Sequence, residues 1–162
     1  MTRTEENMTK DVLVSITGAH NALDLPEDEN EPIEVITPGS YYCKNGKHYI
    51  LFDEIMDGPG DLVHSRVKIT GDHMLEISKT GAANTHMVFE RHKKNMTYYS
   101  TMCGQMMVGI DTQTMDIAVE EDAIRILVNY QLDINQEPLA DCRLQMQVMT
   151  KEKASFSVIA KK

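Results

Sequence analysis

Apolar and polar residues alternate with a period of two along nearly the whole chain, which is the pattern of strands with one dry and one wet face. In the clearest case, every second residue from Ile124 to Ile134 is apolar. No stretch shows the 3.6-residue stripe of an amphipathic helix. The pattern predicts about ten strands, expected near residues 12–16, 41–44, 47–52, 63–69, 75–77, 87–90, 96–103, 106–110, 115–119, 124–134 and 142–148.

Asn45-Gly46 gives the strongest local signal, because this pair between two apolar runs is typical of a two-residue type I′ hairpin. Pairing across that turn sets Cys43 opposite His48 and Tyr42 opposite Tyr49. The lysines at 44 and 47 must stay in water, so the other face is predicted to be buried. That predicted inward face carries Tyr41, Cys43, His48, Ile50 and Phe52.

A second hairpin is predicted after residue 69. A two-residue loop would set Val67 against Glu76, whereas a three-residue loop at 70–72 pairs Val67 with Leu75 and keeps one face dry. The second loop is therefore preferred. Farther along, Gly104 interrupts two apolar runs and suggests a bulge or bend.

About ten strands with short connections leave two architectures, a sandwich or a closed barrel. Sequential hairpins without long crossovers favour an all-β, antiparallel up-and-down barrel of about 8–10 strands, with a β-sandwich as the alternative. Closure also removes the exposed edges that such apolar strands would present. We expect one domain spanning residues 1–162, with an ordered core at about 10–150.

The composition excludes several classes. The chain has 162 residues, 41% of them hydrophobic and 25% charged, which is unlike disordered, collagenous or disulfide-scaffold proteins. The formal net charge of −9 argues against general binding to nucleic acid or to an anionic membrane. There is no run of eighteen apolar residues, and Thr2 to Lys10 is polar, so a cytoplasmic protein is expected.

The three cysteines, Cys43, Cys103 and Cys142, are odd in number and contain no C-x-x-C pair. That spacing does not fit a disulfide framework or a structural zinc site. Buried, reduced thiols are expected instead, with the twelve methionines filling a core that is poor in large aromatic residues. No metal and no cofactor are predicted.

Common catalytic signatures are absent, including G-x-S-x-G, the Walker loop, G-x-G-x-x-G and H-E-x-x-H. One constellation carries a chemical hypothesis. Tyr41, Cys43 and His48, together on a dry face, could orient a ligand or act as acid and base. The alternative is a core histidine whose ring is satisfied by Tyr41 or by a buried water.

An ordered set of motifs resembles a known family. They are Gly39-Ser-Tyr-Tyr-Cys-Lys44, Tyr49-Ile-Leu-Phe-Asp-Glu54, Val67-Lys-Ile69 leading to Lys79-Thr-Gly81, Tyr99-Ser-Thr-Met-Cys-Gly104 and Ile124-Arg-Ile-Leu-Val-Asn-Tyr130. In this order, from about Asp11 to Val148, the chain is similar to the YwiB-like family of uncharacterised bacterial proteins, cytoplasmic β-barrels grouped with the calycins. The resemblance implies a lipocalin-like barrel with no established activity and no catalytic residues to transfer.

The sequence departs from that family at two places. Lys79 stands where arginine is usual, and Met102-Cys103 stand where proline and a larger apolar residue are common. If the usual arginine orders a carboxylate through two hydrogen bonds, Lys79 would hold the same group less rigidly.

Three functions remain open. The first is a module that binds a small apolar ligand in the barrel interior, with Tyr41, Cys43, His48, Met87, Val128 and Met146 as candidate lining residues. The second is a filled barrel that acts through its surface or a homodimer face, with Tyr42 and Tyr49 as candidates. The third, less favoured, is a small enzyme that uses His48 or His86.

Overall fold

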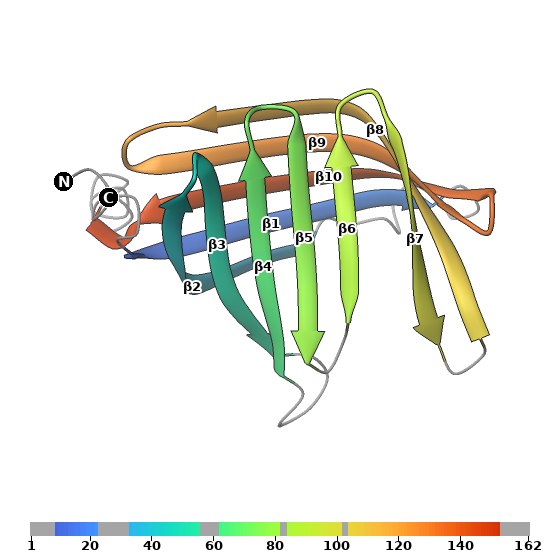
Figure 1. Cartoon of the computed structure of the whole chain (residues 1–162), viewed down its shortest axis with the longest axis horizontal. Coiled ribbons are helices and arrows are strands. Elements are labelled where there is room, and N and C mark those ends of the chain that lie inside the picture. Colours follow the sequence, from blue (N-terminus) through green and yellow to red (C-terminus); the bar gives the residue numbers. More distant parts are fainter. Residues whose placement is uncertain (1–8, 23–32, 56–61, 82–83, 102–103, 153–162) are drawn as a thin grey trace.

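The structure is a computed structural model, and it describes residues 9–22, 33–55, 62–81, 84–101 and 104–152. The described segments form ten strands (Figure 1). They are β1 (Lys10–Ala22), β2 (Ile33–Lys44), β3 (Lys47–Ile55), β4 (Leu62–Thr70), β5 (Met74–Gly81), β6 (Thr85–Glu90), β7 (Lys94–Thr101), β8 (Gly104–Val119), β9 (Ala123–Ile134) and β10 (Glu137–Thr150). No helix among the described residues is long and apolar enough to cross a membrane.

All ten strands belong to one antiparallel sheet in the order β6-β5-β4-β3-β2-β1-β10-β9-β8-β7. Every ladder joins neighbours in the chain except that between β1 and β10, which brings the first and last strands together. Figure 1 shows β2–β6 crossing in front of β1 and β8–β10. The prediction of an all-β, antiparallel up-and-down barrel is therefore confirmed, and the sandwich alternative is not needed.

The barrel closes at the turn between β6 and β7, which are the two end strands of the sheet. The amide of His92 donates to the carbonyl of Thr112, and the amide of Thr112 donates to the carbonyl of Lys93. The Arg91 guanidinium donates to the carbonyls of Asp72, at 2.8 Å, and of Met115, at 2.6 Å. This turn thereby ties β8 to the β4–β5 turn, and the two halves of the molecule meet there.

The predicted pairing across Asn45-Gly46 is confirmed residue by residue. Cys43 pairs with His48, and Tyr42 pairs with Tyr49. Asn45 and Gly46 both have positive φ, at 54° and 76°, as a type I′ turn requires. Local turn chemistry was sufficient to set this register.

Two other predictions are corrected. The β4–β5 loop has three residues, but it occupies 71–73, so Val67 pairs with Ile77 instead of Leu75. The shift is two residues, which keeps the same face dry, and Gly71 takes the positive φ of 57° at the start of the loop. Gly104 is not a bulge inside a strand, because it is the first residue of β8 and pairs with Thr101, the last residue of β7, with φ at 115°.

The predicted strands near 106–110 and 115–119 are one continuous strand, β8, with its irregularity between Thr112 and Thr114. The turn between β9 and β10 was not predicted. Asn135 and Gln136 form it with positive φ at both positions, although neither is glycine. The Asn135 side chain stabilises this turn by accepting a hydrogen bond from the amide of Met107 at 3.1 Å.

Inward-facing side chains fill the middle of the barrel. All the strands from β3 to β6 and from β8 to β10 contribute to one apolar cluster, as does β1. Removing these side chains from water provides the main driving force for closing the sheet. The largest buried members of the cluster are Phe89, Ile50, Ile69, Leu75, Ile110, Met115, Ile126 and Met146.

Candidate functional site

Tyr41 and His48 lie together at the end of the barrel formed by the β2–β3 hairpin. Their side chains are joined by a hydrogen bond of 2.7 Å between the Tyr41 hydroxyl and Nδ1 of His48. The two rings are stacked with centroids 5.8 Å apart. Both residues are half-buried, and so is Cys43, the cross-strand partner of His48. The structure thus brings together the three residues that the sequence pointed to.

Burial keeps this pair uncharged. Desolvation, followed by the neighbouring Cys43, raises the pKa of Tyr41 to about 12. Desolvation also lowers the pKa of His48. At neutral pH the phenol therefore donates its proton to Nδ1, which leaves the His48 N–H on Nε2. This arrangement matches the alternative in which the histidine ring is satisfied by Tyr41.

Little free space adjoins this pair. A pocket of about 70 Å³ is lined by Tyr41, with Val12 and Ile124 at its apolar side and the acidic β8–β9 turn at its rim. Ligand sites for drug-sized molecules have volumes of roughly 300–1,000 Å³, whereas one water occupies about 30 Å³. The pocket is therefore large enough for a few waters and not for an organic substrate.

The other end of the barrel differs, because part of its inward face is only half-buried, although Ile110 and Ala140, which both pair with Leu132, are buried. Along β9, Ile126 and Val128 are fully buried, whereas Tyr130 and Leu132 on the same face are half-buried. The same change occurs on β10 between Met146 and Leu144. We call this region the accessible end; it is defined by Ile16, Met87, Tyr130, Leu132 and Leu144, all packed against the core cluster.

One ion pair also lies on the inner face, beside the accessible end. Glu54 continues the inward series of Ile50 and Phe52 on β3, and Lys79 continues that of Leu75 and Ile77 on β5. Lys79 Nζ lies 3.5 Å from Glu54 Oε2. In the sequence, Lys79 stands out only as a departure from the family pattern. The strand alternation contained the signal, since Lys79 falls two residues after Ile77.

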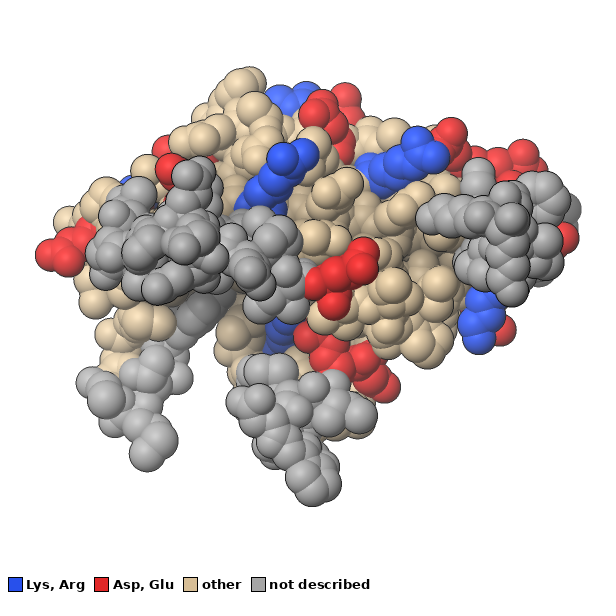
Figure 2. Space-filling view, turned by 180° about the vertical axis from the view of Figure 1, so that it is seen from behind, with Lys and Arg blue, Asp and Glu red and all other residues tan. Residues whose placement is uncertain are grey.

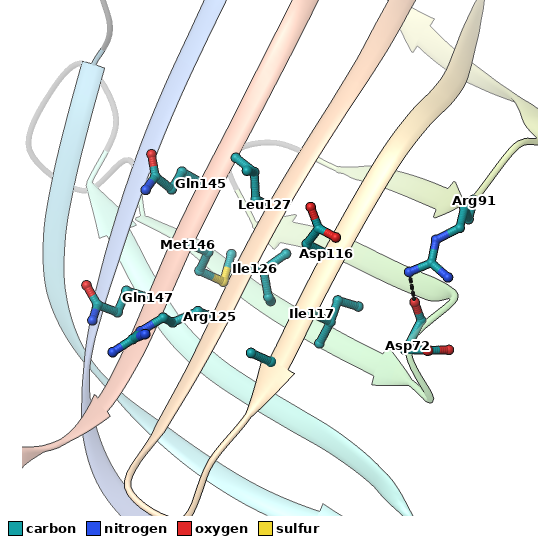
Figure 3. Close-up of a pocket in the computed structure, with 11 residues that line it drawn as sticks. Asp72, Arg91, Asp116, Ile117, Arg125, Ile126, Leu127, Gln145, Met146 and Gln147 are labelled. Atoms are coloured by element: carbon teal, nitrogen blue, oxygen red, sulfur yellow. Dashed lines mark hydrogen bonds between the residues drawn. The ribbon is translucent and has the colours of Figure 1, made fainter.

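A larger hollow, of about 670 Å³, lies on β8, β9 and β10 beside the β4–β5 and β6–β7 turns (Figure 3). Polar side chains make up much of its lining, including Asp116, Arg125, Gln145 and Gln147. Arg91 also lines it, but its guanidinium is held by two backbone carbonyls. This hollow is a mixed polar surface, unlike the apolar accessible end.

The six candidate lining residues are thus distributed over three places. Tyr41, Cys43 and His48 lie at the hairpin end, and Met87 lies at the accessible end. Val128 and Met146 lie between them in the packed core, with 0% and 2% of their surface exposed. Among the described residues, the interior is therefore filled at its centre.

The remaining candidates lie outside the barrel. Tyr42 and Tyr49 stack with their ring centroids 4.8 Å apart and their planes 8° apart. His86 is exposed, and its Nε2 lies 3.2 Å from Glu76 Oε1. Met102 and Cys103 lie outside the described residues. Within the described segments, no three His, Cys, Asp or Glu side chains are grouped so that they could hold a metal ion.

Comparison with known proteins agrees with the fold and the family resemblance. A family model described as a domain of unknown function, DUF1934, matches residues 15–146. The chain is also similar to a solved structure described as the crystal structure of ywiB protein from Bacillus subtilis. The two are 17% identical with a TM-score of 0.76, and the match covers 93% of this chain and 98% of that chain.

At that identity, the structural likeness shows the fold alone. The search of the curated proteins finds no match. The family match, in contrast, spans most of the sequence, including the motifs between Gly39 and Tyr130. The resemblance noted in the sequence is confirmed, and the chain belongs to the family described as a domain of unknown function, DUF1934.

Proposed function

We propose that the protein is a binding module that takes a small apolar ligand at the accessible end of the barrel. The observation that carries the proposal is the change in burial along the inner face. Tyr130, Leu132 and Leu144 point the same way as fully buried neighbours and yet remain half-buried. Apolar side chains left partly in water on an inner wall favour an apolar occupant, because burying them further stabilises the complex.

The chemistry of the accessible end supports such a ligand. Met87 is half-buried against the core, and methionine side chains adapt to ligands of different shapes. The hairpin end is a less suitable site, because its pocket of about 70 Å³ is small and Tyr41 and His48 satisfy each other. A role as an enzyme has correspondingly less support, since the pocket that Tyr41 lines among the described residues is too small for an organic substrate. A cytoplasmic location is part of the proposal, and the free thiols of Cys43 and Cys142 support it.

The test uses N-phenyl-1-naphthylamine, an uncharged dye whose fluorescence rises in apolar surroundings. Saturable binding to the wild-type protein is expected. Leu144→Gln should weaken it, because the substitution places an amide on the apolar wall. Ile36→Gln is the matched control, since Ile36 is 59% exposed and lies away from the packed core. Absence of saturable binding, or equal binding by both variants, would contradict the proposal.

A second candidate is association through the stacked tyrosines. Tyr42 and Tyr49 lie beside Leu51, which is 37% exposed on the same outer face. Paired tyrosines are enriched at protein interfaces because they bring large contact area with little entropy to lose. Sedimentation velocity over a wide concentration range tests it. A species that remains monomeric, or whose association is unchanged in Tyr42→Ser/Tyr49→Ser, would exclude this surface as a dimer face.

A further inference from the structure

The Glu54–Lys79 pair occupies an unusual position for charged residues. Both side chains extend over the inner face of β4, because Lys79 is the cross-strand partner of Ser65 and Glu54 is the partner of Val63. Only 34% of the Lys79 side chain and 20% of the Glu54 side chain is exposed. Removing charges from water is unfavourable unless they are well paired, and a pair of this kind is weak evidence for a role in stability. The position of this ion pair on the inner face of the barrel therefore requires an explanation other than stability.

A third polar group lies on the same wall. Ser65 is 2% exposed, and among the described residues its Oγ has no hydrogen-bond partner. A buried hydroxyl without a partner is rare in native proteins and is destabilising. Glu54, Ser65 and Lys79 together form a polar patch on β3, β4 and β5, in a barrel whose packed centre is apolar.

The polar patch adjoins the accessible end on both sides. Thr85 pairs with Lys79 and lies two residues from Met87 on the same face of β6. On the other side, Thr37 donates to the carbonyl of Asp53, next to Glu54, and pairs with Val14, two residues from Ile16. Figure 1 shows the end of β3, the start of β4, the end of β5 and the start of β6 near one another at the lower edge. Figure 2, seen from behind, shows a basic side chain near acidic ones in the lower part of the molecule.

The charges indicate what the polar patch would bind. A lone lysine on an apolar wall would select an anion, but Glu54 already balances Lys79, and the whole chain carries a net charge of −9. The pair therefore offers donors and acceptors without net charge. A carboxylate ligand would have to compete with Glu54, whereas an uncharged group could accept from Lys79 and donate to Glu54 at once.

We propose that the ligand is an amphipathic molecule whose uncharged polar end, such as a hydroxyl or a primary amide, binds at Glu54 and Lys79 while its apolar part covers the accessible end. This inference rests on the proposed function and specifies the class of ligand. Glu54 and Lys79 thereby determine specificity against both carboxylates and amines.

The experiment measures how three ligands with the same chain displace N-phenyl-1-naphthylamine. They are decan-1-ol, decanoate and decylammonium. The wild-type protein should prefer decan-1-ol. Glu54→Gln leaves Lys79 uncompensated, so decanoate should gain about tenfold relative to decan-1-ol, and Lys79→Gln should favour decylammonium by a similar factor. The double variant should lose both charge preferences.

The controls are Glu76→Gln and Lys68→Gln, which alter an ion pair of 3.8 Å between the neighbouring strands β4 and β5, away from the inner face. They should leave the order of the three ligands unchanged. If the dye binds and Glu54→Gln and Lys79→Gln also leave that order unchanged, the polar end is wrongly assigned and the apolar binding site stands. If the wild-type protein does not bind the dye saturably, the proposed function fails and this inference fails with it.

Discussion

The carboxylate of Asp133 lies directly over Gly109, its partner on the neighbouring strand. A Cβ at position 109 would lie 2.8 Å from Cγ of Asp133 and closer still to Oδ1. The space above this glycine is what allows Asp133, 5% exposed, to form an ion pair with Lys94 on β7. The contact therefore connects β7 and β9 across β8, at the edge of the sheet.

Gly109→Ala is expected to destabilise the protein by about 1–3 kcal/mol, because the added methyl group collides with a buried carboxylate that has little room to move. Urea unfolding measures the change. In an Asp133→Ala background the same substitution should have a much smaller effect, since the colliding atoms are gone. Additive effects in this double-mutant cycle would show that the contact is not the cause.

Arg91→Met is expected to destabilise the closure of the barrel. The substitution removes two hydrogen bonds from a charged donor, to the carbonyls of Asp72 and Met115, each worth about 1.5–3 kcal/mol. Urea unfolding measures the loss of stability, and amide hydrogen exchange at Thr112 measures the local opening of the closure. Arg125→Met is the control, because Arg125 is exposed and lies 3.8 Å from Glu120. An equal effect of the two substitutions would argue against a role of Arg91 in closure.

The pKa of Tyr41 predicts a loss of stability at alkaline pH. The folded-state pKa of about 12 lies above the ordinary value of 10.0. The contribution of Tyr41 is therefore fully present below pH 10 and is lost as the pH rises towards 12, because the unfolded chain releases a proton that the folded protein retains. Stability measured against pH should decline less steeply in Tyr41→Phe. Identical alkaline profiles would contradict the burial of this phenol.

The pKa of His48 predicts the opposite dependence at acid pH. Burial lowers its pKa from 6.5, so the folded protein resists protonation that the unfolded chain accepts. Its contribution is present above pH 6.5 and declines as the pH falls below that value. NMR titration of the imidazole should give a midpoint below 6.5 for His48. A midpoint at or above 6.5 would place the ring in water or beside a carboxylate.

Two methionines distinguish the packed centre from the accessible end. Met146→Ala should cost about 2–5 kcal/mol of unfolding free energy, because the side chain is 2% exposed and its removal leaves a cavity. Met87→Ala should cost distinctly less, since Met87 is half-buried. Urea unfolding compares the two. A larger effect at Met87 would mean that the accessible end is as tightly packed as the centre.

The sequence alone determined the strands, their faces and one register. Alternation with a period of two is a local property, and Asn45-Gly46 specifies its turn through backbone sterics, so Cys43 and His48 could be paired without coordinates. Where the turn residues specify the turn type less strongly than Asn-Gly does, the predicted turn was misplaced or missed. The β4–β5 loop was misplaced by one residue, and the glycine-free turn at Asn135-Gln136 went unseen because its stability comes partly from Met107 on another strand.

Only the tertiary structure decided which end of the barrel is filled and which charges face inward. Val128 is buried and Leu132 is only half-buried, and this difference depends on how far β2–β6 extend over β1 and β8–β10. No local sequence pattern encodes the extent of that overlap. The pairing of Glu54 with Lys79 likewise requires β3, β4 and β5 to lie side by side, although the two residues are 25 positions apart in the chain. Local sequence sets the direction of each side chain, and closure of the sheet sets what that side chain meets.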